Sequence, residues 1–350
     1  MLNIDASNGG GSIVRIAVPF AITKKIKIKI NNIRINRPKP GLRYQHLVAI
    51  QSLCKITDSN LIGGFIGSKN IVIEPGTNYI ETDSIKLETA AAISLVYQLF
   101  SNYSIMSKNK LKIHFQGGGT HTNWSPNIDY IQNLTIPSLE IFGQYSNFEI
   151  NQYGFFPKGG AEGVFTIENK TNNDIIQFDQ TNVTPSLKLI ALISKSLKTK
   201  NVGERIINEF SKYLDLGEIK YSDFSYAINY VTTLNPGASI TAIQYNKNNY
   251  SHGYSVIGSP KITSEDMGMQ LYNLIKDNTT NVSLDKFLVD QLLVALINSK
   301  FNSYIISQKL TNHIDGNLKI INELYHQYDR ELKIMKIDNG KYKIYSSQIL

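Results

Sequence analysis

The sequence has one cysteine, no long apolar run and no sign of a secretion signal. A single cysteine, Cys54, excludes an internal disulfide framework and fits a reducing cytoplasm. No stretch approaches the ~20 apolar residues that a membrane-spanning helix needs. The N-terminus lacks the basic and apolar pattern of a signal peptide. We therefore expect a cytoplasmic protein, with Cys54 in the core rather than acting as a nucleophile.

Two common nucleotide-handling motifs are also missing. The Walker A pattern, G-x-x-x-x-G-K-[ST], does not occur, which disfavours a P-loop ATPase. Nor does Lys-x-Asp-Gly, the motif in which common nucleic-acid ligases carry AMP on lysine. Charged residues make up only 18% of the chain, yet the net charge is +8 and the pI is near 9.2. This basic excess favours polyanionic partners such as RNA or nucleotides, although the lysines are scattered rather than clustered.

Strand-like and helix-like segments alternate along the 350 residues, with glycine turns between them. Strands are expected over 26–30, with 33–35 as a possible continuation, 71–73, 111–115 and 162–167. Helices are expected over 47–54, 89–100 and 128–142. This alternation predicts an α/β or α+β layered fold, with a βαβ-like unit recurring roughly every 60–70 residues. The composition of the sequence changes over about 180–278, which predicts a small inserted domain there and a large domain from 1–179 and 279–350.

Two segments have the composition of phosphate-binding loops. Gly9-Gly10-Gly11-Ser12 precedes a helix-like stretch, where backbone N–H groups can approach a phosphate, although a glycine triplet can also be a plain turn. Four cations then cluster about a proline turn, followed by Gln45 and His46; they are Arg34, Arg37, Lys39 and Arg43. Arginine can grip a phosphate with two hydrogen bonds, but a solvated surface loop has the same composition.

Three histidine or carboxylate positions are candidates for chemistry. The loop 117–126 contains the only tryptophan and is typical of a binding loop, with His121 expected to be solvated there. Asp290-Gln291 is expected to open an apolar helix. His313 follows 23 residues after Asp290, and a lone histidine is commonly structural or on the surface.

Taken together, these segments resemble the RNA 3′-terminal phosphate cyclase family. Residues 4–15 are similar to its IDGS-x-GEGGGQILR, and 34–47 (RINRPKPGLRYQHL) to its R-x-x-R-x-K-P-G-L-x-x-Q-H-L. Further matches are 89–95 to T-A-G-S-x-x-L, 118–130 to GGT-x-x-x-x-APP-x-DF, 154–160 to GFYP-x-GG, 287–292 to YLADQL and 313–317 to H-x-x-T-N. The matches are collinear, span nearly the whole chain and thin out over about 180–278. The proline-glycine and histidine segments are the more specific ones.

The resemblance implies a large domain of three βαβαββ-type units with a smaller α/β domain inserted. It implies conversion of an RNA 3′-terminal phosphate to a 2′,3′-cyclic phosphate with ATP and Mg²⁺ or Mn²⁺. His313 would attack the ATP α-phosphorus and carry AMP, with Asp290 near both the nucleotide and the histidine. The ATP pocket would also include Gln98, Pro126, Tyr130, Phe287 and Gln291, with Pro126 and Phe287 on either side of adenine. Phosphates, including those of the RNA end, would meet Arg15, Arg37, Lys39, Arg43 and Gln45. The sequence assigns no residue to the metal and predicts no oligomeric state.

The sequence also departs from the family pattern. The glutamate before the glycine triplet, a metal contact in the family pattern, has no match, and either Asp5 or Glu88 could stand in for it. Ser12 replaces a glutamine, Phe287 replaces a tyrosine, and Pro19 falls where the family continues a helix, so that helix could start late or kink. Two other functions are open: a catalytically silent RNA-binding relative in ribosomal RNA maturation, and a sugar-phosphate transferase on a similar repeat fold. The silent branch lacks the histidine and the R-x-K-P-G-L text, both of which are present here.

Overall fold

The structure is a computed structural model that describes residues 1–178, 184–217, 219–245, 250–278, 284–337 and 340–349.

The first 74 residues fold as a βαβαββ unit. The elements of the first unit, in chain order, are β1 (Leu2–Asp5), α1 (Gly11–Lys24), β2 (Ile28–Asn31), α2 (Tyr44–Ile56), β3 (Asn60–Ile62) and β4 (Ile71–Glu74). Their sheet has the order β1-β2-β4-β3, in which β1 and β2 are parallel and the other neighbours antiparallel.

The second unit repeats this topology strand for strand. Its elements are β5 (Thr82–Ala92), α3 (Ile93–Ser107), β6 (Leu111–Gly119), α4 (Ile128–Tyr130), the π-helical turn η1 (Ile131–Thr135), α5 (Ile136–Glu140), β7 (Gln144–Gln152) and β8 (Glu162–Asn169). The sheet order is β5-β6-β8-β7, again with one parallel pair followed by antiparallel ones. The same strand order in two successive units confirms a repeat, although its first strands begin at Leu2 and Thr82, which is further apart than the predicted 60–70 residues.

The third unit is described from Leu284 onward. It comprises α8 (Lys286–Asn298), β13 (Tyr304–Ser307), α9 (Asn312–Tyr325), the 3-10 turn η3 (His326–Tyr328), β14 (Arg330–Lys336) and β15 (Tyr342–Gln348). The sheet order β13-β15-β14 matches the last three strands of the other units. A single parallel bridge between Leu284 and Ser307 stands where the first strand would pair. The predicted α+β fold of three βαβαββ-type units is therefore confirmed.

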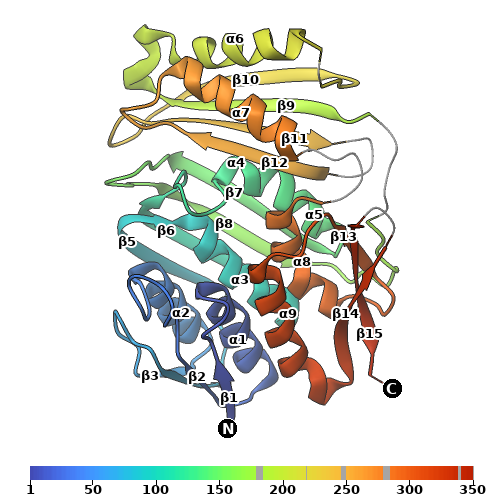
Figure 1. The fold of residues 1–350 in the computed structure, drawn as a ribbon. Helices are drawn as coiled ribbons and strands as arrows, with labels where there is room; N and C mark the ends of the chain where they lie inside the picture. Colours follow the sequence, from blue (N-terminus) through green and yellow to red (C-terminus); the bar gives the residue numbers. More distant parts are fainter. Residues whose placement is uncertain (179–183, 218, 246–249, 279–283, 338–339, 350) are drawn as a thin grey trace.

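A fourth sheet lies between the second and third units in sequence and has a core of its own. Its elements are β9 (Ser186–Ser194), the 3-10 turn η2 (Lys195–Lys200), α6 (Val202–Asp215), β10 (Phe224–Val231), β11 (Ala238–Tyr245), β12 (Tyr250–Ile257) and α7 (Ser264–Asn278). The order is β10-β9-β11-β12, and Leu189, Phe210 and Leu271 are in its hydrophobic cluster. In Figure 1 this sheet lies at the end of the molecule opposite the N-terminus. The predicted domain boundaries fall beside 179–183 and 279–283, outside the described residues, and stay a prediction.

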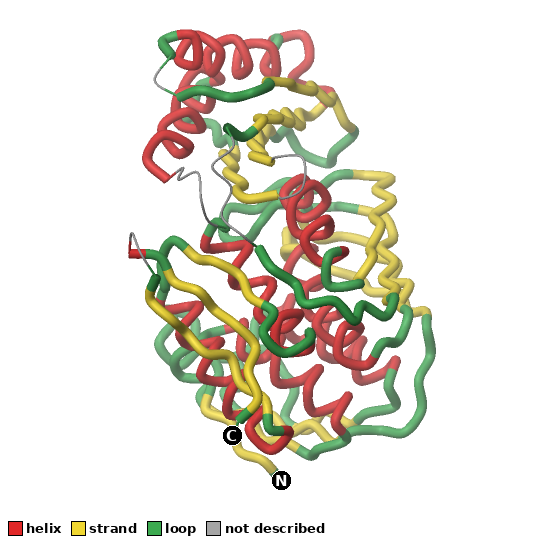
Figure 2. Tube along the Cα trace, turned by 90° about the vertical axis from the view of Figure 1, so that its right-hand side faces the viewer, coloured by secondary structure: helices red, strands yellow, loops and turns green. Residues whose placement is uncertain are grey.

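Helices from all three repeats pack together at the centre of the large body. α1 contacts α3 and α9, and α8 contacts α3 and α9, so the first and third units share one core. Figure 2 shows these helices with strands on their outer sides. The Phe20 and Tyr325 rings meet there at 5.2 Å between centroids. Cys54 is buried, as predicted, and burial raises the pKa of its thiol to about 12, so the nucleophilic thiolate is scarce. No helix in the described part of the chain is long and apolar enough to cross a membrane.

Several local predictions were wrong, each for a physical reason. The alanine-rich stretch 89–92 ends strand β5 instead of starting a helix, because a bulge after Leu87 keeps it paired with Gly119. Residues 33–35 do not prolong β2, since Asn32 has a left-handed backbone (φ 56°) that turns the chain into the basic loop. Of the two effects expected from Pro19, the late start does not occur, because helix α1 begins at Gly11, and the kink stays a prediction. Asp290 does not open α8: Asp285 is its N-cap, and Asp290 lies in the second turn.

Candidate active site

The centre of the site is a histidine on α9 that faces an aspartate on α8. His313 lies in the first turn of α9, which Thr311 caps by accepting a hydrogen bond from the Ile314 amide at 3.1 Å. The Nδ1 of His313 is 2.9 Å from Oδ1 of Asp290, so the expectation that Asp290 lies near the histidine is confirmed. The His313 side chain is 40% exposed and that of Asp290 only 14%.

This pairing determines which ring nitrogen is available. An ionised carboxylate can only accept, so Nδ1 of His313 carries the proton and Nε2 holds the lone pair. Within the described residues, Nε2 of His313 has no hydrogen-bond partner. In the neutral form of this partly exposed side chain, the lone pair therefore lies on the nitrogen that has no protein partner, which is the arrangement in which histidine acts as a nucleophile.

The glycine loop at the start of α1 lies against this pair. Ser12 is buried, and its hydroxyl is 2.7 Å from Oδ1 of Asn317, one turn after His313 on α9. Gly10 has a left-handed backbone (φ 65°), and a Cβ there would lie 3.5 Å from the Arg37 guanidinium. No side chain caps α1, so its first N–H groups and the positive end of its dipole remain for an anion.

Arg15 places a buried cation directly behind the loop. Its Nε donates to Oε1 of Gln98 at 2.7 Å, and its carbonyl accepts from the Asn102 side chain at 3.0 Å. Burial lowers the pKa of Arg15 to about 10, while the charge of Asp290 opposes that shift and the charge of Arg34 adds to it. A guanidinium that is 7% exposed and bonded through Nε to a neutral amide is well suited to bind an anion.

The predicted basic loop lies next to the glycine loop. Arg34 has a left-handed backbone (φ 54°), and its Nε donates to the Gly41 carbonyl at 3.1 Å, which fixes the proline turn. Burial lowers the pKa of Arg34, and the charges of Arg37 and Arg43 lower it further, so the three cations lie near one another. Arg37 and Lys39 are exposed. The cluster can therefore meet a phosphate that approaches the glycine loop.

His46 and Gln45 attach α2 to this assembly. Nδ1 of His46 accepts from the Arg43 amide at 3.1 Å, and the ring is 5% exposed. Burial, together with the charges of Arg15, Arg34 and Arg43, lowers the pKa of His46 to about 3, so the ring is neutral. Gln45 accepts from the Ala92 amide at 3.2 Å. A small cavity between α1, α2 and α3 is lined by Val14, Arg15, Gln45, His46, Ala49, Ile50, Leu95 and Leu99.

The N-terminus of α8 carries the aromatic residue predicted to bind adenine. Phe287 is 54% exposed, with the Lys286 ammonium 5.0 Å above its ring. Gln291, one turn later, donates to the Phe287 carbonyl at 3.0 Å and accepts from the Thr135 hydroxyl at 3.1 Å. Pro126 is half-buried in the loop before α4. The pairing of Pro126 with Phe287 across a base stays a prediction.

Tyr130 lies deeper than an open pocket residue would. It is 3% exposed, and its hydroxyl donates to the Asp285 carboxylate, at 2.8 and 2.9 Å from the two oxygens. Asp285 in turn accepts from the Phe287 and Leu288 amides, which caps α8, and from the Gly253 amide of β12. Burial raises the pKa of Asp285, although these hydrogen bonds oppose the shift. Tyr130 therefore supports the helix that carries Phe287 and Asp290.

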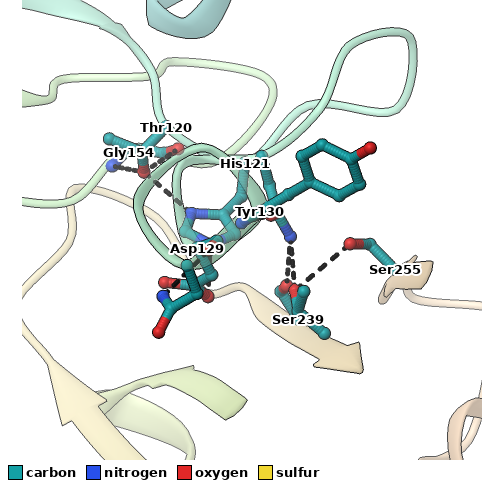
Figure 3. Close-up of polar contacts among 10 residues, drawn as sticks. Thr120, His121, Asp129, Tyr130, Gly154, Ser239 and Ser255 are labelled. Atoms are coloured by element: carbon teal, nitrogen blue, oxygen red, sulfur yellow. Dashed lines mark hydrogen bonds and ion pairs between the residues drawn. The ribbon is translucent and has the colours of Figure 1, made fainter. Parts of the chain in front are cut away.

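His121 is not the solvated loop histidine that the sequence predicted. The ring is fully buried, with Nδ1 2.9 Å from the Thr120 hydroxyl and Nε2 3.0 Å from Asp129 (Figure 3). The Thr120 hydroxyl also bonds the backbone of Gly154, and Asn127 donates to the Ser239 and Thr241 hydroxyls of β11. These contacts fix the loop between the second unit and the inserted sheet, which sequence spacing alone did not indicate.

Two residues of the site were not predicted from the sequence. Ser12 appeared as the end of the glycine loop and as a departure from a motif, and Asn317 only as a letter within one; no role was predicted for either side chain. The spacing of His313 and Asn317, four residues apart on one helix, was the one available signal that both side chains point the same way. Among the described residues, no three His, Cys, Asp or Glu side chains gather as a metal site.

The fold and the site define the class of the protein. It is a repeated βαβαββ protein in which a histidine–carboxylate pair lies beside arginines and a glycine loop suited to phosphates. A family model described as RNA 3′-terminal phosphate cyclase matches residues 6–328, and the chain belongs to this family.

Relatives named RNA 3′-terminal phosphate cyclase are similar over nearly the full length. The Ignicoccus hospitalis protein is 26% identical over 338 residues, which cover 95% of each chain. The Pyrococcus abyssi protein is 27% identical over 350 residues, covering 98% of each. The Sulfurisphaera tokodaii protein is 29% identical over 326 residues, covering 92% of this chain and 93% of its own.

Proposed function

We propose that this protein converts an RNA 3′-terminal phosphate to a 2′,3′-cyclic phosphate, using ATP and a covalent histidine–AMP intermediate. Membership of the family supports cyclase activity in general. The observation that carries the finer proposal is His313, whose Nδ1 is bonded to Asp290 at 2.9 Å while Nε2 is accessible. The cytoplasmic location of the protein stays a prediction.

The first step forms a phosphorus–nitrogen bond at His313. Nε2 attacks the α-phosphorus of ATP, the bond to the bridging oxygen breaks, and pyrophosphate leaves with that electron pair. The ring then carries AMP on Nε2 and its original proton on Nδ1, so it becomes positively charged. Asp290 stabilises that charge because its carboxylate already accepts the Nδ1 hydrogen.

Two further steps return the histidine and close the ring on the RNA. An oxygen of the RNA 3′-phosphate attacks the AMP phosphorus, and the phosphorus–nitrogen bond breaks in favour of Nε2 of His313. The vicinal 2′-hydroxyl then loses its proton, attacks the terminal RNA phosphorus and expels AMP. The sum is one ATP and one 3′-phosphate consumed for one cyclic phosphate, AMP and pyrophosphate.

The residues around His313 suit the two phosphate chains involved. Arg15 and the free N–H groups of α1 lie behind the glycine loop, where a nucleotide phosphate would be bound. The exposed Arg37 and Lys39, with Arg43, would meet the RNA end, and Gln45 would orient a phosphate at the edge of α2.

The base of ATP would stack on the exposed ring of Phe287. A π-face accepts adenine without a hydrogen-bond pattern, so loss of the family's tyrosine hydroxyl leaves stacking intact. Pro126 would cover the other face of the base. Gln98 and Gln291 would line the pocket, and Tyr130 would act through Asp285 on the position of α8.

The donor set fits a divalent metal that arrives with ATP rather than one held by a protein cage. Mg²⁺ and Mn²⁺ in such sites use one or two carboxylates plus phosphates and water, and no larger cluster occurs in the described residues. The metal would neutralise charge on the phosphates. Asp5 is one candidate ligand: hydrogen bonding from Asn32 lowers the pKa of its carboxyl, which favours the ionised form. Glu88, which is exposed, is the other.

The silent RNA-binding relative is the second candidate function. Its branch lacks the histidine, whereas here the histidine is both present and oriented by a carboxylate. Family membership also disfavours the sugar-phosphate transferase.

Incubation of a 3′-phosphorylated RNA oligonucleotide with the protein, ATP and Mg²⁺ tests the proposal. The expected product is resistant to phosphatase and appears only with ATP. His313→Ala should abolish it, and His326→Ala, which removes an exposed histidine at the other end of α9, should not. Product formed equally by His313→Ala, or RNA binding with no product in the wild type, would contradict the proposed function.

A further inference from the structure

We propose that Asn317 and Ser12 are positioning residues, which hold Asp290 as the acceptor for His313 and thereby determine which ring nitrogen attacks ATP. The proposal rests on the proposed function, because it concerns the rate of histidine adenylation. It assigns a task to two side chains that are almost fully buried.

Asn317 and His313 share one acceptor atom. Nδ2 of Asn317 lies 2.6 Å from Oδ1 of Asp290, the same oxygen that Nδ1 of His313 meets at 2.9 Å. The two donors lie one turn apart on α9, so they hold the carboxylate from the same side. Asn317 is 1% exposed, so no water competes with it for Asp290.

The orientation of the Asn317 amide depends on Ser12. The amide oxygen of Asn317 lies 2.7 Å from the Ser12 hydroxyl oxygen, which is also 2.7 Å from the Gly9 carbonyl. A serine hydroxyl has one proton, so it can donate fully to only one of these two oxygens at a time. If the Ser12 proton points to the Gly9 carbonyl, the Ser12 hydroxyl oxygen and the Asn317 amide oxygen face each other at 2.7 Å with no proton between them. Only a flip of the Asn317 amide would avoid this contact.

A flipped amide would put the Asn317 oxygen against the Asp290 carboxylate at the 2.6 Å contact. That arrangement is repulsive while Asp290 is ionised. The favourable state is therefore a directed chain: Ser12 donates to Asn317, Asn317 donates to Asp290, and Asp290 accepts from His313. The direction leaves the proton on Nδ1 of His313 and the lone pair on Nε2.

This series of hydrogen bonds also joins the three helices that form the site. Ser12 is on α1, Asp290 on α8, and His313 and Asn317 on α9. Gly316 keeps α9 close to the glycine loop, since a Cβ there would lie 3.2 Å from the Asn8 carbonyl oxygen. Reorienting one hydroxyl of α1 therefore alters the surroundings of a nucleophile on another helix.

A second carboxylate at position 317 provides a pH-dependent test. Asp290 faces His313 and Asn317 on α9, and its charge also acts on the Arg15 guanidinium of α1 and on the neutral Tyr130 hydroxyl of α4. In Asn317→Asp two carboxylates would stand about 2.6 Å apart and would share one proton. The acid limb of the adenylation profile should therefore move to higher pH.

The experiment measures single-turnover labelling of the full chain with α-labelled ATP, together with ATP affinity, as a function of pH. Asn317→Ala should slow labelling roughly 10- to 100-fold, the effect of removing a hydrogen bond to a charged group. Ser12→Ala should slow it roughly 3- to 10-fold, because the bond that it removes joins two neutral groups. ATP affinity should change by less than about 3-fold, since neither side chain meets the nucleotide. Ser12→Thr keeps the hydroxyl and should restore most of the rate.

Ser138→Ala is the matched control. Ser138 is a buried serine whose hydroxyl donates to the Leu134 carbonyl at 2.8 Å, outside the site. It should lose some stability and keep the wild-type labelling rate. Labelling by Ser12→Ala and Asn317→Ala at the wild-type rate, with an unmoved acid limb in Asn317→Asp, would overturn the positioning role. Failure of the wild type to label at any pH would instead contradict the proposed function.

Discussion

Two histidine–aspartate pairs in this molecule have nearly the same hydrogen bond and different surroundings. His313 meets Asp290 at 2.9 Å, and His121 meets Asp129 at 3.0 Å. The His313 side chain is 40% exposed and that of His121 fully buried. His121 uses its second nitrogen on the Thr120 hydroxyl and stacks on Phe155 at 5.2 Å. His313 keeps its second nitrogen accessible.

The comparison teaches that a carboxylate beside a histidine does not by itself make a nucleophile. The carboxylate selects the tautomer in both pairs, but only a lone pair that substrate can reach allows attack. The buried pair lies in a loop between two sheets, which Thr120 holds through the Gly154 carbonyl and Asn127 through the Ser239 hydroxyl (Figure 3). Four predictions follow, from the largest expected effect to the smallest: the first two separate the two pairs, and the last two test other buried groups near the site.

Replacing the aspartate of the exposed pair should have the largest effect. In Asp290→Asn the amide can donate to Nδ1 of His313, which moves the ring proton to Nε2 and removes the nucleophilic lone pair. Single-turnover labelling with α-labelled ATP should fall about 100-fold or more. The matched change Asp129→Asn should leave the labelling rate per folded molecule unchanged. Equal losses in both variants would mean that the two pairs do not differ in role.

Removing the buried ring should affect stability instead. His121→Ala loses the hydrogen bonds to Thr120 and Asp129 and leaves a cavity beside Phe155. The free energy of unfolding, measured by urea denaturation, should fall by about 3 kcal/mol. His313→Ala, whose ring is partly exposed, should change it by less than about 1 kcal/mol. An unchanged midpoint for His121→Ala would contradict the structural role.

Lowering the pH should test two other buried histidines, His46 and His252. Burial lowers the pKa of His46 to about 3 and that of His252 to about 4, from 6.5 in the unfolded chain. Because the unfolded state then binds more protons, stability is full above about pH 6.5 and falls as pH drops toward those values. At pH 5, His46 alone should account for about 2 kcal/mol of that loss.

His46→Gln measures the share of that single residue. Its unfolding free energy should depend less steeply on pH between about 6.5 and 4 than that of the wild type. Urea denaturation at several pH values provides the measurement. A wild-type slope in His46→Gln would show that another group is responsible.

The smallest effect should come from the hydroxyl that supports α8. Tyr130→Phe removes the donor to Asp285 but keeps the ring against Gly253. The expected loss is about 1 kcal/mol of unfolding free energy, with a weaker ATP affinity because Asp285 caps the helix that bears Phe287. Calorimetric titration with ATP gives the second value. An affinity equal to the wild type would remove Tyr130 from the nucleotide site.

Much of the fold followed from local patterns in the sequence. Alternation at 26–30 and 111–115, and glycines before α1, predicted elements close to β2, β6 and the start of α1. The stretch 89–92 was assigned to a helix because alanine favours helices, whereas pairing with β6 extends β5 through it. Such pairing depends on residues far along the chain, so a window of sequence does not reveal it.

The candidate site, like the fold, could be predicted from the sequence only in part. The pairing of Asp290 with His313 was expected from the family motifs, and the structure brings their atoms together. The link from Ser12 to Asn317 joins residues 305 positions apart and carries no local signature. Equally, nothing in the sequence of the loop distinguished a buried His121 from a solvated one, because its partner Asp129 lies 8 positions further along the chain.

Peptide mapping of the AMP adduct tests the central claim most directly. Wild-type protein incubated with ATP and Mg²⁺ would be digested under alkaline conditions, which preserve a histidine phosphoramidate, and its peptides analysed by mass spectrometry. We predict one AMP, on the peptide that contains His313, with the peptide containing His121 unmodified. AMP on His121, on a lysine, or retained after His313→Ala would contradict the account.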